Sequence, residues 1–142
     1  MPIAKLADVD LYYEVEGETG PWIVFAHGGG DNHLAWWKQV GALRDRYRCV
    51  SYDARWHGRS GQGAVLREAD ETAAADLLGL MDHLKIERAD MMGYSMGGRI
   101  TAYLGQRSPV AVGCGAVAPR RRRRRRGSGG RDVRLHGRTN GF

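Results

Sequence analysis

Ser95 stands at the centre of a glycine-rich stretch, Gly93-Tyr94-Ser95-Met96-Gly97-Gly98, whose residue types could support acyl transfer. A serine hydroxyl becomes accessible to a carbonyl carbon when a sharp, strained turn between a strand and a helix lifts it clear of a sheet. Such a turn has room only for small residues two positions before and after the serine, and Gly93 and Gly97 occupy those positions. The pattern indicates a nucleophile at Ser95, while the same string alone is also common in ordinary loops.

A second glycine-rich stretch, His27-Gly28-Gly29-Gly30, follows the apolar run Trp22-Ile23-Val24-Phe25-Ala26. A continuous apolar run of this length is typical of a parallel strand buried on both faces. Glycines directly after such a strand let main-chain N–H groups approach a ligand oxygen without a Cβ in the way. Read alone, the stretch also fits a flexible turn, and the serine motif downstream favours the ligand-binding interpretation.

A third stretch, Asp53-Ala54-Arg55-Trp56-His57-Gly58-Arg59-Ser60, follows the expected strand Tyr47–Tyr52. In this order and spacing, the motifs H-G-G-G, D-x-R-x-x-G-x-S and G-Y-S-M-G-G resemble those of the α/β-hydrolase family. The resemblance is strongest to its esterases, enol-lactonases and cofactor-free haloperoxidases, and it covers residues 1–106. The chain departs from the family at Trp56, where the family usually has glycine.

The resemblance implies hydrolysis of a carboxylic ester, lactone or related acyl bond of a small molecule, without a cofactor or a metal. Ser95 would be the nucleophile. The oxyanion would bind the main-chain N–H groups of Met96 and of Gly29, with Gly28 as the neighbouring alternative. His27 belongs to the same motif as Gly28 and is expected to be structural.

Hydrophobic periodicity outlines the elements that position these residues. Val9, Leu11, Tyr13 and Val15 alternate with polar residues, which predicts a hairpin at a sheet edge. Apolar residues at helical spacing near residues 34–43, 73–84 and 96–103 predict core-facing helices. Alternating strands and helices indicate an α/β fold with a mostly parallel sheet of about five strands. The resemblance supplies the strand order, 1-2-4-3-5, with the second strand antiparallel.

The acid–base half of the site is not evident in the sequence. In this fold the serine is followed by an acid and then a histidine, but only Asp132 and His136 follow Ser95, and neither follows a readable strand. His57 is expected on a loop at the carboxyl edge of the sheet and is the remaining candidate base. We expect His33 and His83 to be solvated.

The charge distribution changes sharply near residue 106. Residues 1–106 hold 11 Lys and Arg and 15 Asp and Glu, a net charge of −4, whereas residues 107–142 hold 11 Arg and one Asp, a net charge of +10. Residues 107–142 include seven consecutive arginines, Arg120–Arg126, and no amphipathic period. We therefore expect a truncated hydrolase domain over 1–106 and a disordered tail over 107–142.

Two interpretations of the tail remain open. It could be an evolved segment whose arginines bind polyanions without sequence specificity, or it could be out-of-frame sequence that replaces the second half of the domain. The function correspondingly has three candidates: an acyl hydrolase, a catalytically inactive hydrolase-like binding module, and an arginine-tail nucleic-acid binder.

Other features narrow the class of protein. Two cysteines, Cys49 and Cys114, give no disulfide framework and no metal-ligand spacing. The N-terminal residues do not resemble a signal peptide, and no apolar run is long enough for a membrane span. A cytoplasmic location without membrane contact is the expectation, and the oligomeric state stays open.

Overall fold

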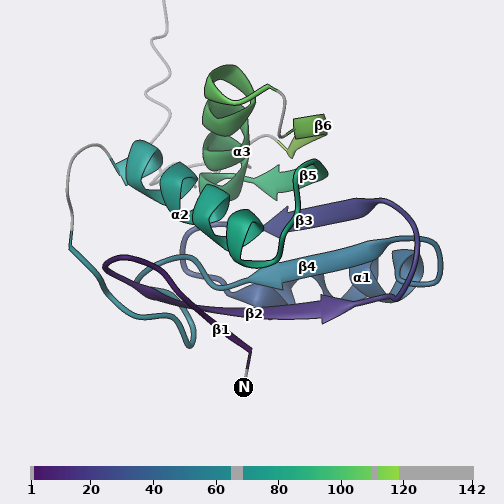
Figure 1. The fold of residues 1–142 in the computed structure, drawn as a ribbon, viewed down its shortest axis with the longest axis horizontal. Helices are drawn as coiled ribbons and strands as arrows, with labels where there is room; N and C mark the ends of the chain where they lie inside the picture. Colours follow the sequence, from purple (N-terminus) through teal and green to yellow (C-terminus); the bar gives the residue numbers. More distant parts are fainter. Residues whose placement is uncertain (1, 65–68, 110–111, 119–142) are drawn as a thin grey trace, which may run out of the picture.

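The structure is a computed structural model that describes residues 2–64, 69–109 and 112–118. Parallel strands with apolar runs form its centre (Figure 1). The strands are β1 (Ile3–Lys5), β2 (Asp10–Glu16), β3 (Trp22–Ala26), β4 (Arg48–Tyr52), β5 (Ala89–Tyr94) and β6 (Val112–Ala118). The helices are the 3-10 turn η1 (His33–Trp36), α1 (Trp37–Leu43), α2 (Ala69–His83) and α3 (Met96–Arg107). None of these helices, in the described part of the chain, has the length and apolar character needed to cross a membrane.

The sheet order is β1-β2-β4-β3-β5-β6, which confirms the predicted order 1-2-4-3-5 for the first five strands. As expected, β1 and β2 form an antiparallel hairpin at the sheet edge, and β2 runs antiparallel to β4. Strand β3 runs parallel to both β4 and β5. The register pairs Ala26 with Gly93, so the carboxyl ends of β3 and β5 lie side by side.

The structure contains a sixth strand that was not expected from the sequence. Helix α3 continues to Arg107, and residues 112–118 form β6, which pairs with β5 in parallel. The expectation of disorder from residue 107 onward is therefore wrong for this segment, and residues 119–142 lie outside the described residues. Gly113 and Gly115 interrupt the apolar pattern of this segment, and it forms a strand by pairing with the edge of β5 that β3 leaves free.

Each face of the sheet has its own core, as the alternation of strand side chains requires. In β3, Val24 and Ala26 pack under α2 and α3, whereas Ile23 and Phe25 pack against η1 and α1 on the other face (Figure 1). The first core also contains Leu11, Val50, Leu77, Leu80, Ile100 and Leu104, and the second contains Trp36, Val40 and Cys49. These two layers fix the ends of β3, β4 and β5 at one edge of the sheet, which is where α/β proteins place their sites.

Candidate active site

Ser95 lies at the turn between β5 and α3, as the sequence predicts. Its backbone has φ 52° and ψ −115°, a conformation with a positive φ that side-chain-bearing residues rarely adopt. Strain of this kind persists only when the surrounding structure enforces it, and it is found at functional sites. The half-buried Ser95 side chain therefore has the backbone setting of a nucleophile elbow.

The two flanking glycines are required by close packing. A Cβ on Gly93 would lie 2.5 Å from the carbonyl oxygen of Gly97, and a Cβ on Gly97 would overlap the carbonyl group of Ala26. The first contact packs the end of β5 against the start of α3, and the second holds the start of α3 against the end of β3. The two glycines of the motif are therefore required for steric reasons, as the sequence predicts.

The glycine-rich stretch after β3 lies next to this turn. Gly28 is buried, and a Cβ there would lie 2.6 Å from Cε2 of the Tyr94 ring. Gly29 is exposed, with open space on the side where a Cβ would be built. Met96 is the first residue of α3, where a main-chain N–H has no partner within the helix. The N–H groups of Gly29 and Met96 thus come from two adjacent strand ends, and the helix terminus favours an anionic oxygen.

Tyr94 connects the serine turn to this glycine-rich loop. Its hydroxyl donates a hydrogen bond to the Asp31 carboxylate, and its ring packs edge-on against Trp36 with 5.6 Å between ring centroids. Burial, followed by the hydrogen bond to Asp31, raises the pKa of Tyr94 above its usual value. The hydroxyl therefore stays protonated and continues to donate at neutral pH.

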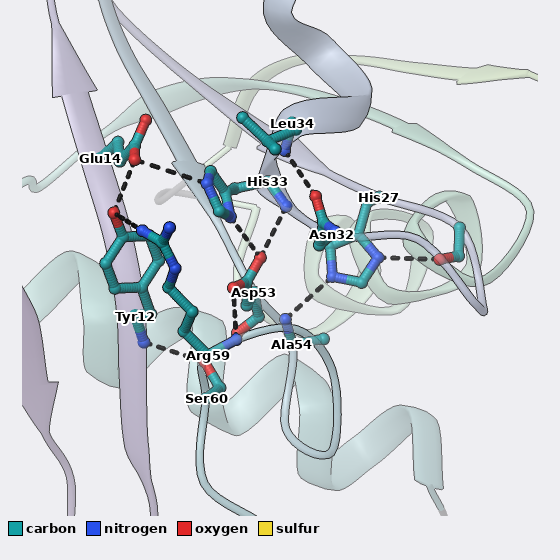
Figure 2. A network of polar contacts seen from close by, with 11 residues as sticks. Tyr12, Glu14, His27, Asn32, His33, Leu34, Asp53, Ala54, Arg59 and Ser60 are labelled. Carbon is teal, nitrogen blue, oxygen red and sulfur yellow. Dashed lines mark hydrogen bonds and ion pairs between the residues drawn. The ribbon is translucent and has the colours of Figure 1, made fainter.

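His27 has a structural role, because both of its ring nitrogens are engaged. Nδ1 donates to the Gly28 carbonyl at 2.8 Å, and Nε2 accepts from the Ala54 N–H at 3.0 Å (Figure 2). Only the neutral ring can make both bonds, and burial lowers the pKa of His27 accordingly. The ring fixes the loop after β3 to the loop after β4 and has no free nitrogen to act as a base.

A buried carboxylate organises the same region. Asp53 is fully buried and accepts three hydrogen bonds, from the His33 N–H at 2.6 Å, from His33 Nδ1 at 2.7 Å and from the Arg59 N–H at 2.8 Å (Figure 2). His33 Nε2 lies 3.4 Å from a carboxylate oxygen of Glu14 on β2. The expectation that His33 is solvated is therefore wrong, since its side chain is 5% exposed between two carboxylates. His83 is exposed, as expected.

His57 is half-buried on the loop after β4. Its Nδ1 donates to the Arg55 carbonyl at 2.9 Å, which leaves Nε2 as the nitrogen with a free lone pair in the neutral ring. The ring packs edge-on against His27 at 5.0 Å, and it lines a small cavity together with Met96. His57 and the serine turn therefore border the same cavity, whereas Asp132 and His136 lie outside the described residues.

The hydrogen bonds between the loops could not be predicted from the sequence. The Asp31–Tyr94 and Asp53–His33 pairs join residues 63 and 20 positions apart, and nothing in the local sequence pattern indicates such a pairing. The only available signal was the position of Asp53, which begins the third motif directly after a buried strand.

Known proteins are similar to this chain in sequence and in fold. The family described as the alpha/beta hydrolase fold matches residues 21–117 of the chain. A curated relative, 3-oxoadipate enol-lactonase 1 of Acinetobacter baylyi, is 41% identical over 98 residues, which are 67% of this chain and 35% of that protein.

Solved structures agree with the sequence relatives. The enol-lactonase from Burkholderia xenovorans LB400 superposes with a TM-score of 0.72 at 36% identity, over 78% of this chain and 44% of that one. Est816, an N-acyl homoserine lactone degrading enzyme, superposes with a TM-score of 0.76 at 30% identity, over 82% of this chain and 44% of that one. The chain thus spans less than half the length of these proteins. On the family match over residues 21–117, the chain belongs to the alpha/beta hydrolase fold family.

Proposed function

We propose that Ser95 is the nucleophile of an acyl hydrolase site for a carboxylic ester or lactone. The observation that carries this proposal is the strained backbone of Ser95 (φ 52°) at the end of β5, between two glycines that cannot accept a Cβ. The similarity to two lactone-cleaving proteins supports the substrate class. Small-molecule acyl compounds are the expected substrates.

The reaction follows from the positions of these groups. Ser95 Oγ attacks the carbonyl carbon, and the N–H groups of Gly29 and Met96 donate to the oxygen that becomes negatively charged. The C–O bond to the alcohol then breaks, the alcohol takes the proton that Ser95 gave up, and an acyl-enzyme remains. Water hydrolyses the acyl-enzyme and restores the serine hydroxyl. In a lactone the leaving alcohol stays attached to the acyl group through both steps, and the product is a single hydroxy acid.

The general base is the least complete part of the proposed site. The segment Met96–Ala118 contains no Asp, Glu or His, so no described residue after Ser95 can complete the family's order of nucleophile, acid and base. We propose His57 as the candidate base, because its Nε2 is free and the residue lines the same cavity as Met96. His57 Nδ1 donates to a main-chain carbonyl and not to a carboxylate, so the imidazolium that forms during catalysis lacks an anionic partner. Turnover by this polypeptide should therefore be slow.

The test is the hydrolysis of p-nitrophenyl butyrate by the full chain and by Ser95→Ala, His57→Ala and His83→Ala. We expect slow hydrolysis that falls measurably, by less than about tenfold, in Ser95→Ala, because general-base assistance of about 10²–10⁴-fold is largely missing. His83→Ala is the control, since His83 is exposed on α2. A rate about a thousandfold above that of Ser95→Ala would contradict the incomplete site. A parallel loss in His57→Ala would then identify His57 as the base.

The alternative is a catalytically inactive, hydrolase-like binding module. It is favoured if hydrolysis is indistinguishable among the full chain and all three variants while a small acyl compound still binds near Ser95. The oxyanion donors would then serve to bind a carboxylate or carbonyl group without reaction.

A third candidate function rests on the run Arg120–Arg126. Seven adjacent guanidinium groups should bind RNA or another polyanion by counterion release, without regard to sequence and with a steep salt dependence. Deletion of residues 120–126 should abolish this binding, whereas a sequence-specific complex that persists at high salt would indicate a selected nucleic-acid surface.

A further inference from the structure

Trp56 occupies a backbone conformation that favours glycine. Its φ is 63°, in the left-handed region. A side chain in this region costs about 1–2 kcal/mol. Trp56 is nevertheless 46% exposed, so burial of its large ring recovers only part of that cost. The conformation must therefore be imposed by the residues around it.

The loop that carries Trp56 is fixed on both sides. The Trp56 N–H donates to the Gly61 carbonyl at 3.0 Å. The neighbouring Arg55 guanidinium makes two bonds of 2.6 Å to the buried Asp76 carboxylate. Gly58, two residues further on, packs so closely on Asp53 that no Cβ fits there. Because the loop is fixed on both sides of Trp56, its backbone is held in this conformation.

A small cavity lies beside this indole. It has a volume of about 80 Å³ and is lined by Trp56, His57, Ala73, Met96 and Ile100, with the Asp70–Arg99 ion pair at 3.0 Å also in its wall. Most of these side chains are apolar, and Met96 directly follows Ser95. Since Trp56 is half exposed while it lines the cavity, it lies at the cavity mouth. The cavity therefore borders the residue next to the candidate nucleophile.

We propose that this cavity binds a short, unbranched aliphatic acyl group, and that Trp56 is the specificity-determining wall of the site. The volume is about half that of a cavity of roughly 150 Å³ that accepts benzene, which allows only a few carbon atoms. The apolar lining favours an alkyl chain, and the position of Met96 beside Ser95 places the chain on the carbonyl side of the scissile bond. The assignment of the acyl group rests on the proposed function, whereas the existence of the alkyl site does not.

The test uses binding and not turnover. The full chain is labelled with ¹³C at the methionine methyl groups, and sodium butyrate is titrated while the Met96 methyl resonance, assigned with Met96→Leu, is followed. We expect a saturable shift that is the same in Ser95→Ala, because the site does not require the nucleophile. Hexanoate should bind no more tightly than butyrate, whereas an open apolar surface would gain about tenfold from two further methylene groups.

Variants of Trp56 separate the contribution of the indole to binding from the cost of the strained backbone to stability. Trp56→Ala and Trp56→Gly both remove the indole, so both should weaken butyrate binding by about fivefold or more. Trp56→Phe keeps an aromatic wall and should bind within about twofold of the unmodified chain. Trp56→Gly should melt at a higher temperature than Trp56→Ala, because glycine accepts the positive φ. Trp37→Ala, which changes an exposed tryptophan that does not line the cavity, is the matched control and should bind normally.

Each alternative result overturns the proposal. No shift at Met96 in the unmodified chain, equal binding by Trp56→Ala, or hexanoate binding about tenfold tighter than butyrate would each exclude an enclosed acyl site walled by Trp56. If butyrate binds as expected but Ser95 neither hydrolyses nor forms a covalent adduct, the alkyl site stands and the hydrolase function fails. Failure of the alkyl site and failure of the hydrolase function are therefore distinguishable.

Discussion

The Tyr94 hydroxyl donates a hydrogen bond to the Asp31 carboxylate, so the residue before the candidate nucleophile is tied to the loop that contains Gly28 and Gly29. The Tyr94 ring also lies against Gly28, where no Cβ would fit. One side chain thus sets the distance between the serine turn and the expected oxyanion donors. The geometry of the site depends on this contact as much as on the two glycine motifs.

Tyr94→Phe should keep the ring packing and loosen the loop. Loss of the bond to Asp31 should cost about 1 kcal/mol of unfolding free energy and speed hydrogen exchange at the Gly29 and Gly30 amides. Exchange measured by NMR and unfolding by urea would check both effects. Tyr103→Phe is the control, because Tyr103 lies on α3 away from the loop. Unchanged exchange at Gly29 and Gly30 would mean that the Asp31 contact does not restrain the loop.

Gly97→Ala should destabilise the fold, because its Cβ would overlap the Ala26 carbonyl and push α3 away from β3. We expect a loss of about 2 kcal/mol or more in urea unfolding. Gly105→Ala in the same helix has open space around the new Cβ and should instead stabilise the chain by about 0.5–1 kcal/mol. Equal effects of the two substitutions would contradict the close packing at the serine turn.

Asp53→Ala should cost about 3 kcal/mol, because it leaves the buried His33 donors without an acceptor. Asp82→Ala, at an exposed position on α2, should change stability by less than about 0.5 kcal/mol. Urea unfolding at neutral pH measures both. A loss for Asp53→Ala as small as that of Asp82→Ala would show that the buried network does not hold the loops together.

Tyr52 should make the fold sensitive to alkaline pH. Its hydroxyl is buried and has no hydrogen-bond partner among the described residues, and burial raises the pKa of Tyr52 well above 10.0. A group whose pKa is raised by folding contributes stability that is present below its unfolded pKa and is lost as the pH rises through the folded value. The unfolding free energy should therefore fall above about pH 10.

Tyr52→Phe should remove the Tyr52 part of this dependence. At neutral pH the variant should be as stable as the unmodified chain or more stable, because an unpaired buried hydroxyl is replaced by hydrogen. Urea unfolding at a series of pH values compares the two. A variant that loses stability above about pH 10 as steeply as the unmodified chain would assign the alkaline loss to other groups.

The parts of the fold that follow local patterns could be predicted from the sequence. The alternation from Val9 to Val15 predicted the hairpin, and the apolar run Trp22–Ala26 predicted β3. A strained turn at Ser95 was predicted from its motif, and the structure shows the strain as a φ of 52°. The departure at Trp56 was also visible in the sequence, but only the structure shows that a tryptophan adopts the glycine-like φ of 63°.

The other features of the fold and the site depend on contacts between residues that are distant in the sequence. Val112–Ala118 has too many glycines to be recognised as a strand, and it forms one by pairing with β5. His33 was expected to be solvated because no motif surrounds it, yet Asp53 and Glu14 enclose it from other strands. Local periodicity contains no information about such partners.

The reaction of Ser95 with an alkyl fluorophosphonate tests the central claim most directly, because the reagent reports a serine in an oxyanion-binding setting without requiring full turnover. Mass spectrometry of the full chain should show a single adduct, formed slowly with loss of fluoride, and peptide mapping should place it on Ser95. Ser108→Ala should react normally and Ser95→Ala should not react. Absence of an adduct in the unmodified chain, or an equal adduct in Ser95→Ala, would contradict the assignment of Ser95 as the nucleophile.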